Sequence, residues 1–213
     1  MSNTLSRSYF ESSPLKIARD LIGKILEVKT RFGLVTLEIV ETEAYMGRQD
    51  PASHAYKHKT PSNSQMFMEP GTLYVYFTYG MHYCMNVKCW PPGTPGAVLF
   101  RGLRPISGFE TLYKLSGKDA QIKLKDLTNG PAKLTRALGI DKSFNGYDIT
   151  LKDSNIKILN NPGYNGRVVR SPRIGISRNT DKLWRFYEAN CEFVSKHRFP
   201  SKAKPVAICR KNT

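Results

Sequence analysis

Long apolar runs are missing from this sequence. No stretch approaches the roughly 18–20 uninterrupted apolar residues of a membrane span, and the opening segment MSNTLSRSYFESSPLK lacks the apolar core of a signal peptide. We therefore expect an intracellular protein that does not insert into a membrane. Hydrophobic residues still make up 40% of the 213 residues and charged residues 23%, which is typical of a chain that folds around a packed core.

Cysteine is also scarce, and its spacing does not suit a metal. The four cysteines form no CxxC pair, and only His82 lies near two of them; they are Cys84, Cys89, Cys191 and Cys209. The sequence contains no HExxH, GxSxG, P-loop or GxGxxG motif. We expect free thiols packed as small hydrophobic groups, no serine or cysteine nucleophile, and no metal or nucleotide cofactor.

Acidic residues are few relative to basic ones. Asp and Glu number 17 against 33 Lys and Arg, which leaves a net charge of +16. Such a field attracts polyanions, and nucleic acid is the commonest of these, whereas no basic amphipathic helix is long enough to lie on an anionic membrane. Six Lys and Arg and no acid fall within residues 196–213, so part of the charge belongs to a basic tail that could be merely solvated.

Nothing in the sequence divides the chain. It carries no internal repeat and no linker rich in Gly, Ser or Pro, so we expect a single domain over residues 1–213. Cap residues and apolar spacing predict three short helices, over residues 14–22, 107–116 and 131–138.

A sheet is predicted between the first two helices, where the apolar period changes from about 3.6 residues to 2. In residues 34–45 the odd positions are apolar up to Ile39. If the alternation continues, the odd positions Glu41, Glu43 and Tyr45 lie on that same face.

A β-hairpin is predicted from residues 72–87, with its turn near Tyr79 and Gly80. Residues 168–178 and 184–195 add further β-like stretches. Helices and strands do not alternate strictly along the chain. We therefore expect an α+β fold with a mainly antiparallel sheet and flanking short helices, rather than a doubly wound parallel sheet.

Glu43 is the first candidate for chemistry. A carboxylate on the continuation of an apolar strand face loses hydration, which suits it to proton transfer. A Glu at a strand end can equally be exposed where the core finishes. Glu41 shares the predicted facing, but two carboxylates on one side of one strand point in parallel and flank a substrate poorly, so we rank it second.

Tyrosines gather around the predicted hairpin, near Phe67 and Phe77; they are Tyr45, Tyr74, Tyr76, Tyr79 and Tyr83. Aromatic planes stack on extruded or single-stranded bases, although a tyrosine-rich strand can also reflect β propensity and half-burial. Tyr79 differs from the others. An aromatic beside Gly80 at a hairpin tip faces solvent, where it could act as a wedge between base pairs.

Two further side chains could take part in binding. His54 lies in a polar loop, where a histidine is usually solvated but can hydrogen-bond a purine edge or orient a carboxylate. Arg101 lies inside the apolar run AVLFRGL, and a buried guanidinium needs a carboxylate or phosphate partner. We expect Arg101 to pair with Glu43 or with a DNA phosphate.

Several long motifs follow one another in order. They are VETEAY at residues 40–45, His54, MFMEPGTLYVYFTYGMHYCMNV at 66–87, AVLFRGLRP with Arg101, NGPAKLTRALGI at 129–140, PRIGISR, and WRFY near Trp184. Together they resemble the alkyladenine (3-methyladenine) DNA glycosylase family over about residues 15–194. The resemblance implies a small α+β domain with a curved, mainly antiparallel sheet and a protruding β-hairpin that enters the minor groove of DNA.

The resemblance also implies roles for matching positions. Glu43 would be the general base that activates water, and Arg101 would support that carboxylate. Tyr79 would fill the gap left by the flipped nucleotide, and Met81 would contact DNA beside it.

Four matching residues would bind the substrate. Tyr45, His54 and Tyr76 would line the pocket and sandwich the damaged base. Asn86 would restrict guanine through its exocyclic amine.

The implied activity is that of a monofunctional, cofactor-free and monomeric DNA glycosylase. Its substrates would be alkylated or deaminated purines in double-stranded DNA, such as 3-methyladenine, 7-methylguanine, hypoxanthine and ethenoadenine. Two departures from the family pattern are visible: Ser62 replaces an expected arginine, which would weaken a DNA contact, and Gly102 replaces a common alanine, which would loosen the packing behind Arg101.

Two other functions remain open. One is a non-catalytic basic nucleic-acid-binding protein that uses the tyrosines as stacking platforms. The other is a hydrolase of soluble nucleosides, which would use Glu43 but neither the positive charge nor Tyr79.

Overall fold

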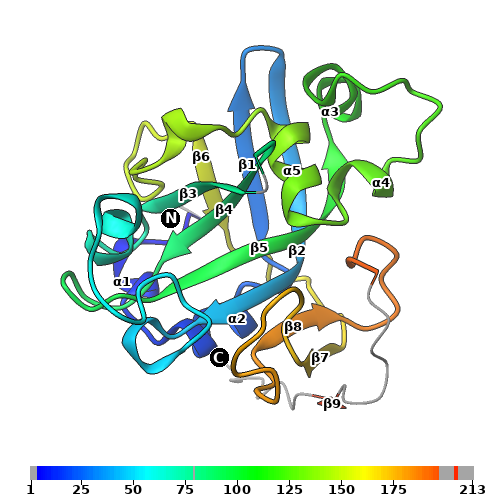
Figure 1. Cartoon of the computed structure of the whole chain (residues 1–213). Helices are drawn as coiled ribbons and strands as arrows, with labels where there is room; N and C mark the ends of the chain where they lie inside the picture. The colour runs from blue at the N-terminus through cyan, green and yellow to red at the C-terminus, as the bar shows by residue number, and fades with distance from the viewer. Residues whose placement is uncertain (1–3, 79, 197–203, 206–213) are drawn as a thin grey trace.

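The computed structural model describes residues 4–78, 80–196 and 204–205 (Figure 1). Tyr79, Cys209 and most of the basic tail over residues 196–213 lie outside the described residues. In the described part, nine strands form one curled sheet with the order β3-β4-β5-β2-β8-β7-β9, and β1 joins it between β2 and β6. Every strand pair is antiparallel, which confirms the α+β prediction.

The strands are β1 (Ile25–Thr30), β2 (Gly33–Tyr45), β3 (Leu73–Thr78), β4 (His82–Lys88), β5 (Ala97–Ser107), β6 (Ile156–Leu159), β7 (Val168–Ser171), β8 (Arg185–Glu188) and β9 (Lys204–Pro205). The helices are α1 (Arg7–Phe10), α2 (Pro14–Asp20), α3 (Phe109–Ser116), α4 (Lys125–Thr128) and α5 (Pro131–Leu138). Three 3-10 turns complete the described part of the fold: η1 (Gly47–Gln49), η2 (Pro61–Phe67) and η3 (Lys142–Phe144).

Helix ends follow the local sequence. The Ser13 side chain accepts a hydrogen bond from the Lys16 amide and caps α2, and Gly139, with φ of +67°, ends α5. Helix α3 begins later than predicted, because Ser107 is still the last residue of β5. Gly108, with φ of +79°, then redirects the chain into the helix.

The main core lies between one face of the sheet and helices α2, α3 and α5. Ile17, Leu112 and Leu134 from these three helices pack in the same buried cluster as Leu37 of β2 and Phe100 of β5. Removing such apolar surface from water is the main favourable contribution to folding. No described helix is long and apolar enough to cross a membrane.

The apolar face of β2 does not continue as the sequence parity predicts. Leu37 and Ile39 face the main core, but the β2–β5 register shifts between Ile39 and Glu41 and again between Glu41 and Thr42. Beyond these irregularities Thr42 donates to a carbonyl of α2 and Ala44 lies in the core. The prediction for Glu41, Glu43 and Tyr45 was therefore wrong, because a bulge moves odd positions to the other face of the sheet.

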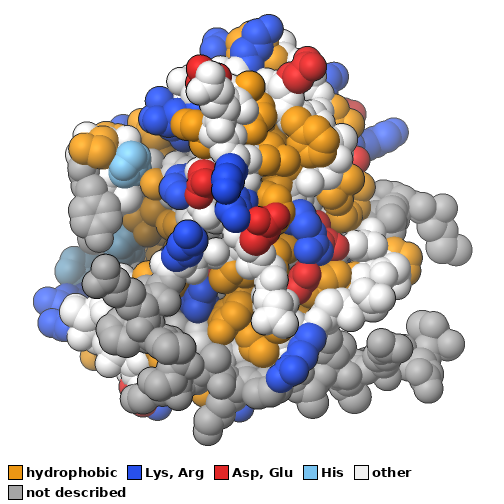
Figure 2. Space-filling view, turned by 90° about the vertical axis from the view of Figure 1, so that its right-hand side faces the viewer, with side chains coloured by type: hydrophobic (Ala, Val, Ile, Leu, Met, Phe, Trp, Pro, Cys, Tyr) orange, Lys and Arg blue, Asp and Glu red, His pale blue; other side chains and the backbone are white. Residues whose placement is uncertain are grey.

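Charged side chains of both signs lie on one face of the molecule. Figure 2 shows the face on the right-hand side of Figure 1, where basic, acidic and hydrophobic side chains lie intermixed. The net positive charge of the chain is thus not gathered into one uniform basic surface on this side.

Candidate active site

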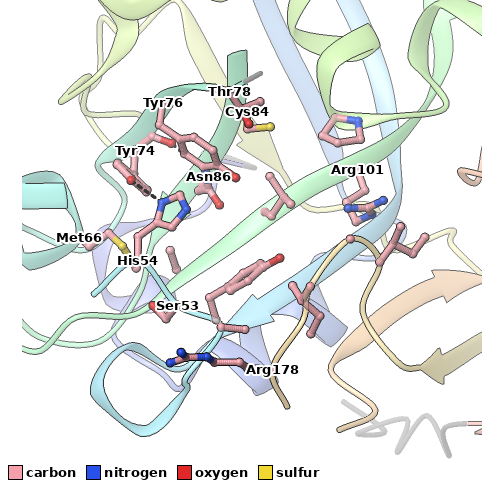
Figure 3. Close-up of a pocket in the computed structure, with 18 of the residues that line it drawn as sticks. Ser53, His54, Met66, Tyr74, Tyr76, Thr78, Cys84, Asn86, Arg101 and Arg178 are labelled. Atoms are coloured by element: carbon pink, nitrogen blue, oxygen red, sulfur yellow. Dashed lines mark hydrogen bonds between the residues drawn. The ribbon is translucent and has the colours of Figure 1, made fainter. Parts of the chain in front are cut away.

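A cavity of about 480 Å³ opens between the sheet and two loops (Figure 3). The sheet contributes Tyr45 of β2, Tyr76 of β3 and Arg101 of β5, while the loops contribute residues 51–54 and 174–178. This volume lies within the roughly 300–1,000 Å³ of typical small-molecule sites. Among the residues that the structure describes, no Asp or Glu forms part of the cavity wall.

One wall of the cavity is aromatic. His54 packs edge-on against Tyr76, with 4.6 Å between ring centroids, and its Nδ1 lies 2.8 Å from the Tyr74 hydroxyl (Figure 3). Burial lowers the pKa of His54 below its ordinary value, so the imidazole is neutral at neutral pH. The structure thus brings together His54 and Tyr76 and adds Tyr74 to the cavity. Tyr74 could have been predicted there, because residues two apart on a strand face the same side of the sheet.

Glu43 lies directly behind the cavity wall and has no exposed surface, which excludes the exposed strand-end interpretation. Its Oε2 accepts hydrogen bonds from the Tyr45 hydroxyl at 2.9 Å and from Arg101 Nη1 at 3.3 Å. Its Oε1 accepts from the backbone N–H of Ile174 at 2.7 Å. All three donor residues line the cavity, so the carboxylate lies one layer behind its surface beside a fixed positive charge.

Arg101 contacts Glu43, one of its two predicted partners, and also Glu41. Arg101 Nε donates to Glu41 Oε1 at 3.1 Å, and Arg185 Nε donates to the same oxygen at 2.6 Å. Ser195 donates to Glu41 through both its hydroxyl and its amide, each at 2.6 Å. Burial raises the pKa of Glu41, but the two guanidinium groups and the Ser195 hydrogen bonds outweigh burial and hold the pKa below its ordinary value.

A second buried ion pair ties together the two loops of the cavity. Arg173 donates to both oxygens of Asp50, at 2.5 and 2.9 Å, and Asn179 donates to the same carboxylate at 3.2 Å. The Arg173 guanidinium also lies over the rings of Tyr45 and Trp184, at 4.6 and 5.0 Å from their centroids. Sequence reasoning missed this pair, because the partners are 123 positions apart and both lie in loops.

Two residues of β4 complete the floor. Asn86 is buried and donates to the backbone oxygen of Tyr74 at 3.0 Å, which fixes its amide and leaves its side-chain oxygen as an acceptor. Cys84 also lines the cavity. Burial raises the pKa of the Cys84 thiol, so that it is protonated at neutral pH and is a poor nucleophile.

The hairpin of β3 and β4 carries exposed apolar side chains at its tip. Phe77 is 55% exposed and Met81 is 70% exposed. Gly80 has φ of +66°, which suits the reversal of the chain between the strands. The candidate wedge Tyr79 lies outside the described residues, so only its neighbours can be placed.

The two departures from the family pattern have different surroundings. A Cβ at Gly102 would lie 2.7 Å from the carbonyl oxygen of Phe193 and 3.0 Å from the Cβ of Glu41, so backbone already fills the space of the missing methyl group. The expected loosening behind Arg101 was therefore wrong. Ser62 is exposed in η2 and hydrogen-bonds Thr60 at 3.0 Å, and its effect on DNA binding stays a prediction.

Within the described part of the chain, no group of three or more His, Cys, Asp or Glu side chains is arranged to hold a metal ion. The site residues are instead aromatic rings, one buried carboxylate and its arginine. This arrangement can hold a flat ring and can accept a proton at the same place.

Comparison with known proteins assigns the family. The sequence profile of the family described as "Methylpurine-DNA glycosylase (MPG)" matches residues 8–192. A protein of Prosthecochloris aestuarii, provisionally named a 3-methyladenine DNA glycosylase, is 44% identical over 192 residues, which cover 89% of this chain and 90% of its own. Proteins with the same name from Francisella tularensis and Carboxydothermus hydrogenoformans are 45% and 41% identical over 84% and 90% of this chain, and 92% and 98% of theirs. This chain belongs to the methylpurine-DNA glycosylase family.

Proposed function

We propose that this chain is a monofunctional DNA glycosylase that flips alkylated or deaminated purines out of double-stranded DNA and hydrolyses their N-glycosidic bond. The observation that carries the proposal is a carboxylate with no exposed surface, Glu43, held by Arg101 and Tyr45 directly behind an aromatic cavity of about 480 Å³. Cavities lined by aromatic side chains with a few convergent polar groups are the usual form of a binding or active site.

Glu43 is the general base in the proposed reaction. The bond between C1′ of the sugar and the purine nitrogen breaks, its electron pair leaves with the base, and the sugar gains oxocarbenium character. Glu43 stabilises that positive charge and accepts a proton from the water whose oxygen bonds to C1′. A cationic lesion leaves as the neutral base and the proton on Glu43 returns to solvent, whereas a neutral lesion leaves as an anion that takes up one proton. The products in both cases are the free base and an abasic site. Because water is the nucleophile, no Schiff base forms and the strand is not cut.

Arg101 orients the carboxylate for this step. Its Nη1 lies 3.3 Å from Glu43 Oε2, longer than the roughly 2.7–2.9 Å of a strong charge-assisted hydrogen bond. Because Glu43 has no exposed surface, a water reaches Oε2 from the cavity side by displacing this long contact. We place the attacking water there, between Glu43 and the sugar.

The aromatic residues of the cavity hold the flipped base. Tyr45, His54 and Tyr76 sandwich the purine, and such stacking contributes roughly 1–3 kcal/mol per base. Asn86 restricts guanine by opposing its exocyclic amine. The proposed lesions are 3-methyladenine, 7-methylguanine, hypoxanthine and ethenoadenine.

DNA contact is assigned to the hairpin tip and to the net charge. Met81 is exposed there, and Tyr79, the adjacent wedge candidate, would fill the space left by the flipped nucleotide. The charge of +16 supplies phosphate binding that is independent of sequence and falls steeply with salt. A monomer suffices, because one site acts on one lesion at a time.

The test is base release under single-turnover conditions. The protein, in excess, is incubated with a duplex that contains one hypoxanthine, with methylated DNA, and with the same duplex undamaged as the control. Chromatography detects the free bases, alkali reveals abasic sites, and borohydride detects any covalent intermediate. We expect base release from both damaged substrates, nicking only after alkali, and no borohydride adduct.

Each other outcome has a definite meaning. No release despite tight, salt-sensitive binding would establish the non-catalytic nucleic-acid binder instead. Equal rates on free nucleosides and on duplex DNA would establish a nucleoside hydrolase. A borohydride adduct, or nicking without alkali, would overturn the monofunctional mechanism.

A further inference from the structure

The ring of Tyr45, which closes one side of the cavity, has a cation behind it. The guanidinium carbon of Arg173 lies over this ring, 4.6 Å from its centroid. The Arg173 side chain has no exposed surface and is not part of the cavity wall. It therefore contacts the face of Tyr45 that points away from the cavity.

The cavity itself offers positive charge and no carboxylate at its surface. Arg101 and Arg178 line it, whereas no Asp or Glu does within residues 4–78 and 80–196 (Figure 3). Glu43 and Asp50 lie behind the wall without exposed surface, and each is bound by an arginine. A ligand in the cavity thus meets guanidinium groups and aromatic faces first.

We infer that Arg173 is a specificity-determining positioning residue, which acts through Tyr45 to disfavour purines that carry a positive charge and to favour neutral ones. An aromatic ring attracts a cation through the negative potential of its face. A guanidinium on one face reduces that attraction on the other, and it repels a second cation directly. A neutral purine stacks without this repulsion. Alkylated bases such as 7-methylguanine are cationic, whereas hypoxanthine and ethenoadenine are neutral.

Asp50 moderates this effect without cancelling it. Its carboxylate binds the N–H edge of Arg173, whereas the guanidinium lies over the Tyr45 ring. The same carboxylate also accepts hydrogen bonds from the Ala52 amide and from Asn179, so its negative charge is shared among several donors. Neutralising Asp50 should therefore strengthen the influence of Arg173 on the ring.

The experiment measures the ratio of 7-methylguanine release to hypoxanthine release under single-turnover conditions. Asp50→Asn with Arg173→Met removes both charges together and avoids an unpaired buried carboxylate. We expect this double variant to raise the ratio by about threefold or more. Asp50→Asn alone leaves the arginine uncompensated, and we expect it to lower the ratio. Arg170→Gln, an exposed charge on β7, is the matched control and leaves the ratio unchanged.

The two variants are expected to shift the release ratio in opposite directions, which a purely structural role of Arg173 would not do. If both variants lose activity on both lesions by the same factor, Arg173 serves only to hold the loops, and the inference is wrong. If thermal melting shows that the double variant is unfolded, the direction of the Asp50→Asn shift decides alone. The inference rests on the proposed function: no release of either base by the wild type overturns both, whereas release with unchanged ratios overturns this inference only.

Discussion

Strands β2, β5 and β8 carry two clusters of glutamate and arginine that differ in how far they are buried. The covered cluster consists of Glu41, Glu43, Arg101 and Arg185, and the open cluster consists of Glu38, Arg104 and Glu188. The Arg101 side chain is 7% exposed and both glutamates of the covered cluster are fully buried. In the open cluster the Arg104 side chain is 35% exposed, and those of Glu38 and Glu188 are 9% and 14% exposed. Along β2, Glu38 precedes the register shifts near Glu41, Glu41 lies between them and Glu43 follows them.

Burial changes how much an ion pair contributes to stability. An exposed ion pair contributes little to stability, because water screens it and its side chains lose entropy. A buried pair costs desolvation, and it persists where its groups are held by further hydrogen bonds. Ser195 and the Ile174 amide supply these bonds in the covered cluster. We conclude that the covered cluster is where chemistry is expected, and that the open cluster, whose arginine is partly exposed, is structural.

Removing the arginine of the covered cluster should have the largest effect. Arg101→Met leaves Glu43 without its counter-charge and removes one of the two arginines that bind Glu41. We expect the free energy of unfolding to fall by about 3–5 kcal/mol, the usual cost of breaking a buried pair. Urea denaturation measures it. A loss below about 1 kcal/mol would show that the cluster is no more costly to break than a surface pair.

A hydrogen bond to the covered cluster can be removed without removing a charge. Ser195→Ala deletes the hydroxyl that donates to Glu41 at 2.6 Å and keeps the amide bond. We expect a loss of about 1.5–3 kcal/mol, as for other hydrogen bonds to charged groups. Urea denaturation beside Ser107→Ala, an exposed serine of β5, supplies the comparison. Equal stability of the two variants would show that the Ser195 hydroxyl does not stabilise the covered cluster.

The open cluster should tolerate the matched change. Arg104→Met removes the partner of Glu38 and Glu188, whose side chains are 9% and 14% exposed, so water reaches these carboxylates only in part. We expect a loss of about 1–2 kcal/mol in the free energy of unfolding, more than for a fully exposed pair and less than for Arg101→Met. The rate of base release should stay within about twofold of wild type. A loss as large as that of Arg101→Met would remove the distinction between the clusters.

The smallest expected effect concerns acid stability near the cavity. Burial lowers the pKa of folded His54 below the 6.5 of an exposed histidine, so its contribution to stability is fully present above pH 6.5 and is lost as pH falls through the folded pKa. In His54→Gln we therefore expect a shallower loss of Tm between neutral and mildly acidic pH. Differential scanning fluorimetry across this pH range measures the slope. A slope in His54→Gln identical to that of the wild type would contradict the burial argument.

Much of the fold could be predicted from the sequence because its signals are local. Caps and apolar spacing located α2 and α5, and alternation located β2 and the β3–β4 hairpin. The β-like stretches over residues 168–178 and 184–195 were too long, since only β7 and β8 pair there. Strands β1 and β6 escaped prediction, although they pair with each other at the sheet edge.

The site was predicted in part, for a different reason. The buried Arg101 and its pairing with Glu43 followed from the cost of an unpaired buried charge, and the structure places them together. The facing of Glu43 was derived from parity, which the register shifts in β2 invalidate. Asp50 and Arg173 gave no signal, because a contact between two distant loops depends on the whole fold.

The most direct test compares one carboxylate from each cluster on the same strand. Single-turnover release of hypoxanthine from a duplex is measured for Glu43→Gln and for Glu38→Gln, with DNA binding measured in parallel. We expect Glu43→Gln to bind DNA but to lose at least about 100-fold in rate, as for a general base, and Glu38→Gln to stay within about twofold of wild type. A Glu43→Gln rate within about threefold of wild type would contradict the assignment of chemistry to the covered cluster.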